Sequence, residues 1–369
     1  MTTTGTESRR LRLGTRGSRL ALTQSGQVAE ALRQAAAAGA LGEGSGGLGI
    51  DLVTVRTDGD GDRTPLRQLG GVGVFAARLR HALLDGEVDL VVHSFKDLPT
   101  QPVEGLEVVC VPPREDPRDA LCARDGLTLA TLPEGARVGT GSPRRTAQLL
   151  ATRPDLEVVD LRGNVPTRLA RVRGLEAVGV GTDEPVAPAR ADAAGDLDAV
   201  VLALSGLRRL GLEHCASEVL DLETMLPAPA QGALAVEARA GEDSVELARA
   251  VAVLDDDPTR LAVTAERALM ARLGAGCAAP VGAWAHLRGG EQEQRVLVLR
   301  AVVTSLDGGQ EVGCELSTEL PEASGGPGAP GNTAAVRAAE ALGARAAEVL
   351  LEDGAAQIVD LHASKPRRD

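Results

Sequence analysis

Aromatic residues are almost absent from this chain of 369 residues, which has two phenylalanines, one tryptophan and no tyrosine. They are Phe75, Phe95 and Trp284. Proteins that bind single-stranded nucleic acids stack the bases on aromatic side chains, so the composition argues against that class. Apolar residues still make up 43% of the chain. The hydrophobic core must therefore be built from alanine, valine and leucine.

The sequence shows neither a membrane-spanning segment nor a secretion signal. No run of about 18 apolar residues occurs, which is the length that a bilayer requires. Residues Met1 to Arg10 lack the apolar core of a signal peptide. The net charge of -13 argues against general binding to nucleic acids or anionic membranes, although it permits a local basic pocket. We expect a cytoplasmic protein with no nucleic-acid or membrane partner.

Cysteine and histidine are few and scattered. The five cysteines are odd in number and form no Cys-x-x-Cys pair, which favours a reducing compartment over a disulfide framework. The five histidines lack the spacing of metal ligands, so we expect no metal site.

Short β-rich runs alternate with helical patterns through most of the chain. The alternation predicts an α/β fold with largely parallel strand pairing, and the length suggests two or three domains. Strands are expected at Leu11–Gly14, Ile50–Arg56, Asp89–His93, Leu106–Val111, Arg137–Gly139, Leu156–Leu161, Asp198–Leu204 and Ala233–Glu237. Helices are expected at Ser18–Ala37, Phe75–Leu84, Ser142–Ala151, Asn164–Val172 and Pro258–Leu273.

The C-terminal part has a different pattern. Arg295–Ser305 and Gln310–Leu320 predict a strand pair, and an Ala-rich helix is expected near Asn332–Leu351. Two strands followed by a helix indicate a small separate α+β domain. Segments rich in glycine, proline or other small residues are expected to be surface loops: Ala38–Gly49, Gly174–Gly195 and Glu322–Gly331.

Three strand-to-helix junctions carry arginines beside small or hydroxyl residues: Gly14–Arg19, Gly139–Arg145 and Leu161–Arg168. A helix N-terminus has free N–H groups and a positive dipole end, which suits a carboxylate or a phosphate. Each junction alone is equally an ordinary helix cap with solvated arginines. Together, in an acidic protein, they favour a cleft for a ligand with many carboxylates, because arginine binds carboxylate in a two-pronged way.

Another candidate site follows the expected strand at Asp89–His93. The strand leads directly into Ser94, Lys96 and Asp97, and in open α/β sheets ligands bind beyond the carboxyl ends of strands. Asp97 could accept hydrogen bonds and stabilise a nearby cation. A turn capped by Asp97 explains the pattern equally well.

Cys277 stands in a loop of small residues, Gly274–Gly282, between an expected helix and an expected strand. The glycines leave room beside the sulfur for a bulky group. The ordinary alternative is a small buried thiol. No His and Asn arrangement supports a cysteine protease.

Taken together, these segments closely resemble the porphobilinogen deaminase family. The resemblance covers nearly the whole chain. Each motif is weak alone, but so many motifs in the same order as in the family do not arise by chance. The shared segments are Gly14–Ser18, Thr64–Leu66, Gly70–Phe75, Val92–Leu98, Arg114–Asp119, Gly139–Arg145, Leu161–Arg168, Gly206–Gly211, Leu226–Ala233, Thr264–Arg272 and Gly276–Gly282.

The resemblance implies a hydroxymethylbilane synthase activity, a transferase that condenses four porphobilinogen units and releases ammonia each time. It implies one dipyrromethane cofactor per chain, joined by a thioether to Cys277, and a catalytic Asp97. The implied cofactor-binding residues are Ser94, Lys96, Thr140, Ser142, Arg144 and Arg145. The implied substrate-binding residues are Arg16, Ser18, Phe75, Arg162, Arg168, Arg209 and Gln231. The implied partner is the small-molecule substrate, with the protein as a monomer.

The residues suit this chemistry. Loss of ammonia from porphobilinogen leaves an electron-poor methylene-pyrrolenine, which is positively charged when protonated, and a fixed carboxylate at Asp97 would stabilise that charge. Each added ring brings an acetate and a propionate, which a series of arginines would offset. A covalent anchor makes each addition effectively intramolecular.

Three departures from the family pattern stand out. Val72 occupies a position where many relatives carry lysine. Ala230 replaces a glycine, and it adds a Cβ at a hinge position where a positive φ is expected. The segment Gly174–Gly195 is longer than in most relatives. These changes motivate a slower paralogue as an alternative.

By resemblance, the fold consists of two periplasmic-binding-protein type II-like α/β lobes and a small C-terminal α+β domain. The expected boundaries are residues 1–112 with 233–250 for domain 1, 118–226 for domain 2 and 255–369 for domain 3. Two-lobed folds also serve as ligand receptors, and a fold alone does not fix an activity. A binding protein for polycarboxylate pyrroles therefore remains the main alternative to the enzyme.

Overall fold

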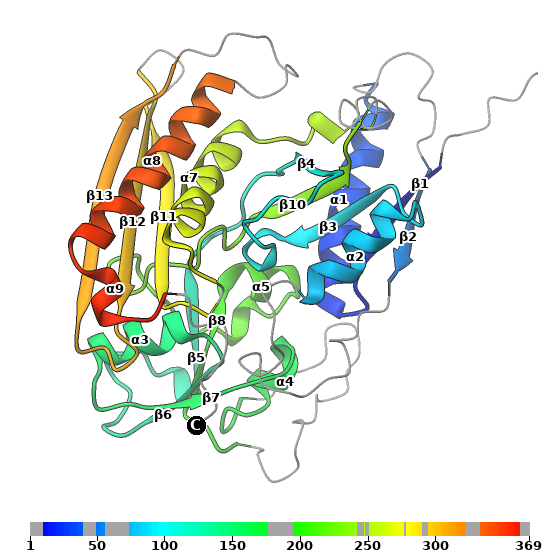
Figure 1. Ribbon diagram of the computed structural model, residues 1–369. Coiled ribbons are helices and arrows are strands. Elements are labelled where there is room, and N and C mark those ends of the chain that lie inside the picture. The colour runs from blue at the N-terminus through cyan, green and yellow to red at the C-terminus, as the bar shows by residue number, and fades with distance from the viewer. Residues whose placement is uncertain are drawn as a thin grey trace, which may run out of the picture.

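The computed structural model describes residues 10–39, 49–55, 74–175, 195–241, 247, 251–276, 278–289, 294–321 and 333–361. Within these ranges the strands form three separate sheets, two of five strands and one of three. Figure 1 shows the first sheet with α1 and α2, the second sheet with α3 and α4 below it, and the third sheet beside α7 and α8. The predicted fold class, two α/β lobes with a small C-terminal α+β unit, is therefore confirmed.

The first lobe is built on a sheet with the strand order β2-β1-β3-β10-β4. Its strands are β1 (Arg10–Thr15), β2 (Gly49–Thr54), β3 (Leu90–Ser94), β4 (Leu106–Cys110) and β10 (Leu234–Arg239). Helices α1 (Arg19–Ala37) and α2 (Val74–Leu84) belong to this lobe, and the short 3-10 helix η2 (Phe95–Asp97) follows β3 directly. Buried Val28 and Leu32 of α1 pack on Leu13 and Leu90 of the sheet, so the helix covers its core with one apolar face.

The second lobe repeats this topology with the order β7-β6-β8-β5-β9. Its strands are β5 (Asp119–Ala123), β6 (Arg137–Thr140), β7 (Glu157–Asp160), β8 (Ala199–Ala203) and β9 (Glu218–Val219). Its helices are α3 (Pro143–Thr152), α4 (Val165–Leu169) and α5 (Leu204–Arg209), with 3-10 turns η3 (Arg124–Gly126) and η5 (Glu213–Cys215). Each lobe thus has the same fold around its own core.

The expectation of largely parallel pairing is wrong. In the first sheet β1 pairs in parallel with β2 and β3, but β10 is antiparallel to both β3 and β4. In the second sheet β5 is antiparallel to β8 and β9 in the same way. In each lobe the antiparallel strand is the one that adjoins a crossing between the lobes, so its direction follows from the route of the chain.

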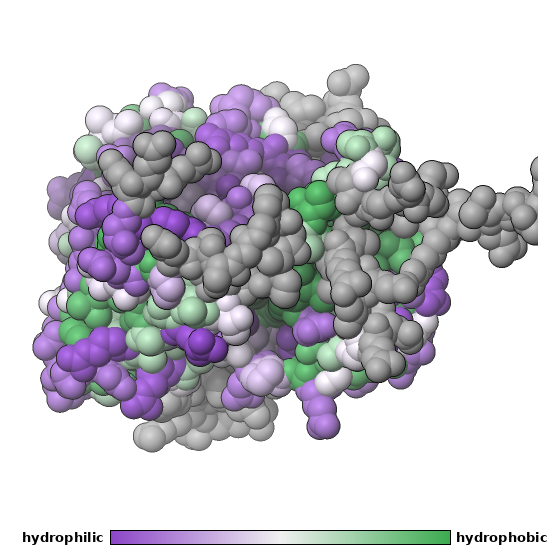
Figure 2. Space-filling model, turned by 90° about the horizontal axis from the view of Figure 1, so that it is seen from above, coloured by the Kyte–Doolittle hydropathy of each residue, from purple (hydrophilic) through white to green (hydrophobic). Residues whose placement is uncertain are grey.

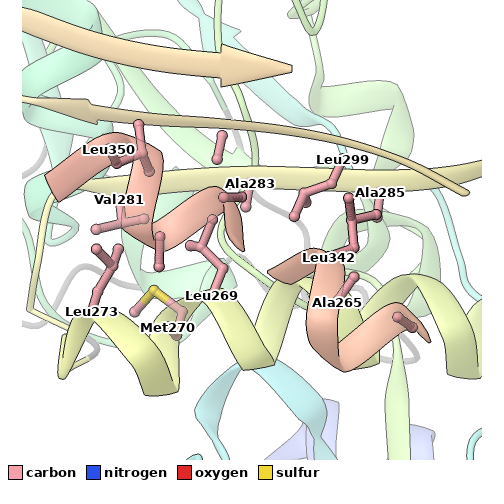
Figure 3. Packing of buried hydrophobic residues seen from close by; sticks show 14 of the residues in the cluster. Ala265, Leu269, Met270, Leu273, Val281, Ala283, Ala285, Leu299, Leu342 and Leu350 are labelled. Carbon is pink, nitrogen blue, oxygen red and sulfur yellow. The ribbon is translucent and has the colours of Figure 1, made fainter. Parts of the chain in front are cut away.

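The C-terminal unit is an antiparallel sheet with two long helices on one face. It contains β11 (Val281–Arg288), β12 (Val296–Thr304), β13 (Glu311–Glu319), α7 (Asp257–Leu273), α8 (Thr333–Glu352) and α9 (Ala355–Ile358). Figure 3 shows Leu269 and Leu273 of α7 directed toward Val281 and Ala283 of β11, with Leu342 of α8 in the same cluster. Alternate residues of β11 face this core, as the two-residue period of a strand requires.

The cores are made almost entirely of alanine, valine and leucine, as the composition predicts. Phe95 is the aromatic residue that reaches full burial among the described side chains, and it packs in a small cluster with Val111 and Ala233. Small core residues allow close approach of the backbones. The clearest case is Gly343 of α8, where an added Cβ would lie 2.1 Å from the carbonyl oxygen of Ala265 on α7.

Two segments cross between the lobes, one before β5 and one before β10. They touch where the Glu115 N–H donates to the Gly232 carbonyl at 3.4 Å. Ala230 has φ of +61°, which confirms the positive φ predicted for this position. Gly232 has φ of +89°, and a Cβ there would lie 2.3 Å from the Glu115 carbonyl oxygen, so only glycine fits.

The surface seen from above is mostly hydrophilic, with apolar residues in separate patches among the polar ones (Figure 2). A helix with the length and apolar character needed to cross a bilayer is not found among the described residues. The described ranges also contain no group of three or more His, Cys, Asp or Glu that could hold a metal ion.

Candidate active site

The candidate site residues lie where strands end and helices begin. Ser18 is the N-cap of α1, Ser142 of α3 and Asn164 of α4, so the strand-to-helix junctions predicted from the sequence are confirmed. In each sheet the parallel strands end at the same edge, which gathers these junctions together. The two lobes therefore each present helix N-termini and arginines at one sheet edge.

The serines of the first lobe have partners within the protein. Ser18 accepts a hydrogen bond from the Ala21 N–H at 3.3 Å, which is the ordinary cap geometry. The Ser94 hydroxyl is paired with the side-chain amide of Gln24, a buried residue of α1, at 2.9 and 3.1 Å. Gln24 thereby supports the end of β3, a role that sequence reasoning missed because nothing marks a glutamine on the inner face of a helix.

Lys96 and Asp97 share the turn η2 but differ in environment. Asp97 is exposed, whereas Lys96 is half-buried and its ammonium donates to Gln231 Oε1 at 3.2 Å. Burial lowers the pKa of Lys96 to about 8. The negative charge of Asp97 raises this pKa, and the positive charges of Arg145 and Arg144 lower it further. The amine is therefore close to cations from the other lobe.

Those cations are held by Asp119, the first residue of β5, which is fully buried. One carboxylate oxygen accepts from Arg144 Nη2 at 2.7 Å. The other accepts from Arg145 at 2.7 and 3.1 Å and from Gln231 Nε2 at 2.8 Å. Burial opposes ionisation of Asp119, yet the two arginine charges and these hydrogen bonds hold its pKa well below the usual range.

This arrangement changes what three predicted residues can do. Arg144 and Arg145 are buried and bonded to Asp119 and to the carbonyl oxygens of Leu226 and Val201, respectively. Gln231 is fully buried between Lys96 and Asp119. These three side chains are therefore engaged by groups of the protein itself. Sequence reasoning quoted Asp119 within a motif but missed its role, which only tertiary packing reveals.

A second group of predicted residues lies at the ends of β6 and β7. Ser142 caps α3 by position, but its hydroxyl makes no cap hydrogen bond, while Thr140 Oγ1 accepts from the Ser142 N–H at 3.2 Å. Arg168 donates to the Gly163 carbonyl at 2.8 Å. Burial, then the like charges of Arg145 and Arg162, lower the pKa of Arg168 to about 10.

Asp97 of the first lobe also acts on Arg168 of the second, in the direction that favours the charged guanidinium. The exposed carboxylate and the cations of both lobes therefore lie within electrostatic reach of one another. The cations of this group, Lys96, Arg144, Arg145, Arg162 and Arg168, outnumber the acids that influence them, Asp97, Asp119 and Asp160. The structure thus brings together residues from four predicted motifs into a site with excess positive charge.

The remaining predicted residues are more peripheral or outside the described parts. Arg209 donates to the Gly232 carbonyl at 2.7 Å and so holds the crossing segment, and Arg16 is half-buried between β1 and α1. Phe75 lies in the first turn of α2, but its side chain is outside the described residues. Cys277 and Val72 also lie outside them.

Comparison with known proteins identifies the family. The dipyrromethane cofactor binding domain of porphobilinogen deaminase matches residues 11–247, and the porphobilinogen deaminase C-terminal domain matches residues 260–352. The chain belongs to the porphobilinogen deaminase family. The porphobilinogen deaminase of Cutibacterium acnes is 52% identical over 97% of this chain and 99% of its own length. The porphobilinogen deaminase of Micrococcus luteus is 51% identical over 94% of this chain and 93% of its own length.

Porphobilinogen deaminases are thus similar to this chain over both lobes and the C-terminal unit. Among solved structures, the ligand binding component of an ABC-type import system from Staphylococcus aureus matches with a TM-score of 0.34 and 9% identity, over 71% of this chain and 73% of its own. A TRAP periplasmic solute binding protein from Roseobacter denitrificans with bound β-D-glucuronate matches with a TM-score of 0.33 and 10% identity, over 67% and 78%. At these scores the likeness adds no argument about function.

Proposed function

We propose that this protein joins four porphobilinogen units stepwise on a dipyrromethane primer, with loss of one ammonia per unit, and that water then cleaves the product from the primer as hydroxymethylbilane. The observation that carries the proposal is the convergence of cations from both lobes on the turn with Asp97, in a chain of the porphobilinogen deaminase family. A growing pyrrole chain carries two carboxylates per ring, so it supplies the negative charge that this site lacks.

The residues present fit a polycarboxylate cofactor. Burial, then the like charges of Arg145 and Arg162, lower the pKa of Arg168, so a carboxylate placed beside these arginines would be favoured. The hydroxyl of Ser142 has no cap role, so it can donate to a carboxylate. We therefore assign Lys96, Thr140, Ser142 and Arg168 to the cofactor and growing chain, with Arg144 and Arg145 as the buried charges behind them.

The chain's own residues divide the work as follows. Asp97 is exposed, and its carboxylate stabilises positive charge that develops on the substrate when ammonia leaves. Lys96 is held by Gln231 and presents an ammonium to substrate carboxylates. Cys277 is the anchor, and when bound the dipyrromethane supplies the free pyrrole carbon to which the first unit is joined. Anchoring keeps each addition intramolecular.

The remaining assignments of the proposal concern organisation and location. We assign residues 1–112 with 233–250 to domain 1, 118–226 to domain 2 and 255–369 to domain 3. Arg16, Ser18, Ser94, Phe75, Arg162 and Arg209 keep their proposed binding roles. We further propose a monomer that works in the cytoplasm. Light scattering of the purified protein at micromolar concentration tests the oligomeric state directly.

Intact mass of the purified protein tests the anchor. The wild-type chain should exceed its sequence mass by two condensed pyrrole units and give a pink colour with Ehrlich's reagent. Cys277→Ala should lose this excess, whereas Cys314→Ala, a control at a half-buried thiol on β13, should keep it. A wild-type chain at its bare sequence mass, even after incubation with porphobilinogen, contradicts the proposal.

Ammonia release separates an enzyme from a receptor or a slow paralogue. Asp97→Asn should keep the primer but lose most of its turnover, because the compensating negative charge is gone. Asp85→Asn, a matched change at an exposed position just after α2, should behave like wild type. Near-normal initial rates in Asp97→Asn overturn the role of Asp97, and a wild-type chain that binds primer without ammonia release supports the receptor.

A further inference from the structure

The turn that carries Lys96 and Asp97 is too short to be stabilised by its own backbone hydrogen bonds. Helix η2 spans only Phe95–Asp97, and its closing hydrogen bond is that from the Leu98 N–H to the Phe95 carbonyl at 3.2 Å. A 3-10 helix of one turn leaves its last carbonyl oxygens in need of other donors. The position of Asp97 therefore depends on what binds these carbonyls.

A single guanidinium from the C-terminal unit binds carbonyl oxygens at the start of this turn and just after its end. Arg267 Nη1 donates to the Leu98 carbonyl at 2.7 Å and to the Phe95 carbonyl at 3.3 Å, and Nη2 donates to the Pro99 carbonyl at 2.7 Å. The same guanidinium lies over the Phe95 ring, 4.4 Å from its centre. Its partners thus stand on both sides of Asp97 in the sequence.

Arg267 belongs to α7, the helix that leads to the anchor loop. Helix α7 ends at Leu273, Gly274 takes the left-handed conformation that ends the helix, and Cys277 follows three residues later in the sequence. The helix is also fixed to both crossing segments, because Glu266 binds Arg114 at 2.7 and 3.1 Å and the Ala230 N–H at 2.5 Å. Helix α7 therefore contacts both crossing segments and the turn with Asp97, and the segment with Cys277 follows it in the sequence.

We propose that Arg267 is a positioning residue that sets the place of Asp97 relative to the anchored chain. The inference rests on the proposed function, since it presumes that Asp97 is catalytic and that Cys277 holds the primer. The planar fork of a guanidinium can reach three carbonyls and stack on a ring at once, which a lysine ammonium cannot do. Arg267 does not need to touch the substrate to act, because a misplacement of about 1 Å can cost roughly 10²-fold in rate.

Kinetics of Arg267→Gln and Arg267→Lys test the role. Both variants should carry the primer by intact mass, with kcat for ammonia release lower by about 10- to 100-fold and KM within about twofold of wild type. Lysine should recover little of the loss. Arg272→Gln is the matched control, since Arg272 is exposed on the same helix and pairs with Glu348 at 3.2 Å.

A double-mutant cycle with Asp97→Asn distinguishes positioning from general damage. If Arg267 acts by placing Asp97, then Arg267→Gln should cause no further loss in an Asp97→Asn chain. Equal losses in both backgrounds, or loss of the primer from Arg267→Gln, overturn the inference. Phe95→Leu removes only the stacked ring and should show a smaller loss of the same kind, so it carries the test if Arg267→Gln does not fold.

The behaviour of the wild-type chain distinguishes failure of the proposed function from failure of the proposed role of Arg267. A wild-type chain that carries no primer and releases no ammonia refutes the proposed function itself. A wild-type chain with full turnover, together with near-normal kcat in Arg267→Gln, refutes only the role of Arg267.

Discussion

Asp119→Asn removes the buried carboxylate that binds both Arg144 and Arg145. The substitution keeps the shape of the side chain but takes away the charge that both guanidiniums share. It also places an amide N–H₂ group where one of the two oxygens now accepts hydrogen bonds, so either the donor of Arg144 or the donors of Arg145 and Gln231 must face another donor. The two arginines, 3% and 5% exposed, cannot turn to solvent.

The expected cost is large because the pair is buried. Breaking a buried ion pair by removing one partner costs about 3–5 kcal/mol, since the remaining charge stays desolvated. The matched control is Asp51→Asn, whose ion pair with Arg10 lies at the surface, where solvent screening leaves it little effect on stability. With an unfolding entropy of about 2.1 cal/mol/K per residue, 3 kcal/mol lowers Tm by about 4 °C if the whole chain unfolds together, and by more if one lobe unfolds alone.

Thermal unfolding of wild type, Asp119→Asn and Asp51→Asn at several pH values measures the stability that is lost with each carboxylate. The folded-state pKa of Asp119 lies below its unfolded value of about 3.9, so its contribution is complete above that pH and is lost as pH falls below it. The Tm difference between wild type and Asp119→Asn should therefore be constant near neutral pH and shrink in acid. An Asp119→Asn chain with a Tm equal to that of Asp51→Asn would refute the reasoning.

Two further predictions concern single positions. Ala230→Gly should stabilise the protein by about 1 kcal/mol, because Ala230 has φ of +61° and glycine relieves that strain; a lower urea midpoint would contradict this. The fluorescence of Trp284, the single tryptophan, should fall in acid because His286 stacks on it at 4.1 Å and quenches when protonated. Burial, then the charge of a neighbouring arginine, lower the pKa of His286, so quenching should begin below about pH 6.5 and vanish in His286→Gln; quenching with a midpoint above pH 7 would count against it.

The sequence predicts most elements of the fold because local signals define them. Apolar runs mark β3 and β8, and Ser18, Ser142 and Pro143 mark helix starts that the structure confirms. The strand β5 was missed because Asp119–Ala123 is short and holds an aspartate and two alanines, which are depleted in strands. The antiparallel direction of β10 could not be foreseen from local pattern, since it depends on the route of the chain through the second lobe.

The site is predictable in its parts but not in its pairing. The arginines at the junctions and the turn with Lys96 and Asp97 follow from motif and position, and so does the positive φ at Ala230. Which arginines are neutralised inside the protein is a matter of tertiary contact. Asp119 and Arg267 act through residues far away in sequence, so neither could be assigned a partner before the fold was known.

The interleaved path of the two sheets sets an order in which they can be completed during synthesis. All strands of the second sheet lie between residues 119 and 219, whereas the first sheet needs β10, which ends at Arg239, to join β4 to β3. As the ribosome delivers the chain from its N-terminus, the second lobe can form its sheet before β10, the strand between β3 and β4 of the first lobe, has been synthesised. A nascent chain that stalls after β9 and before β10 has all strands of the second sheet, but in the first sheet β3 and β4 lack the strand that lies between them. The unpaired edges of β3 and β4 are then exposed, and a chaperone could bind them.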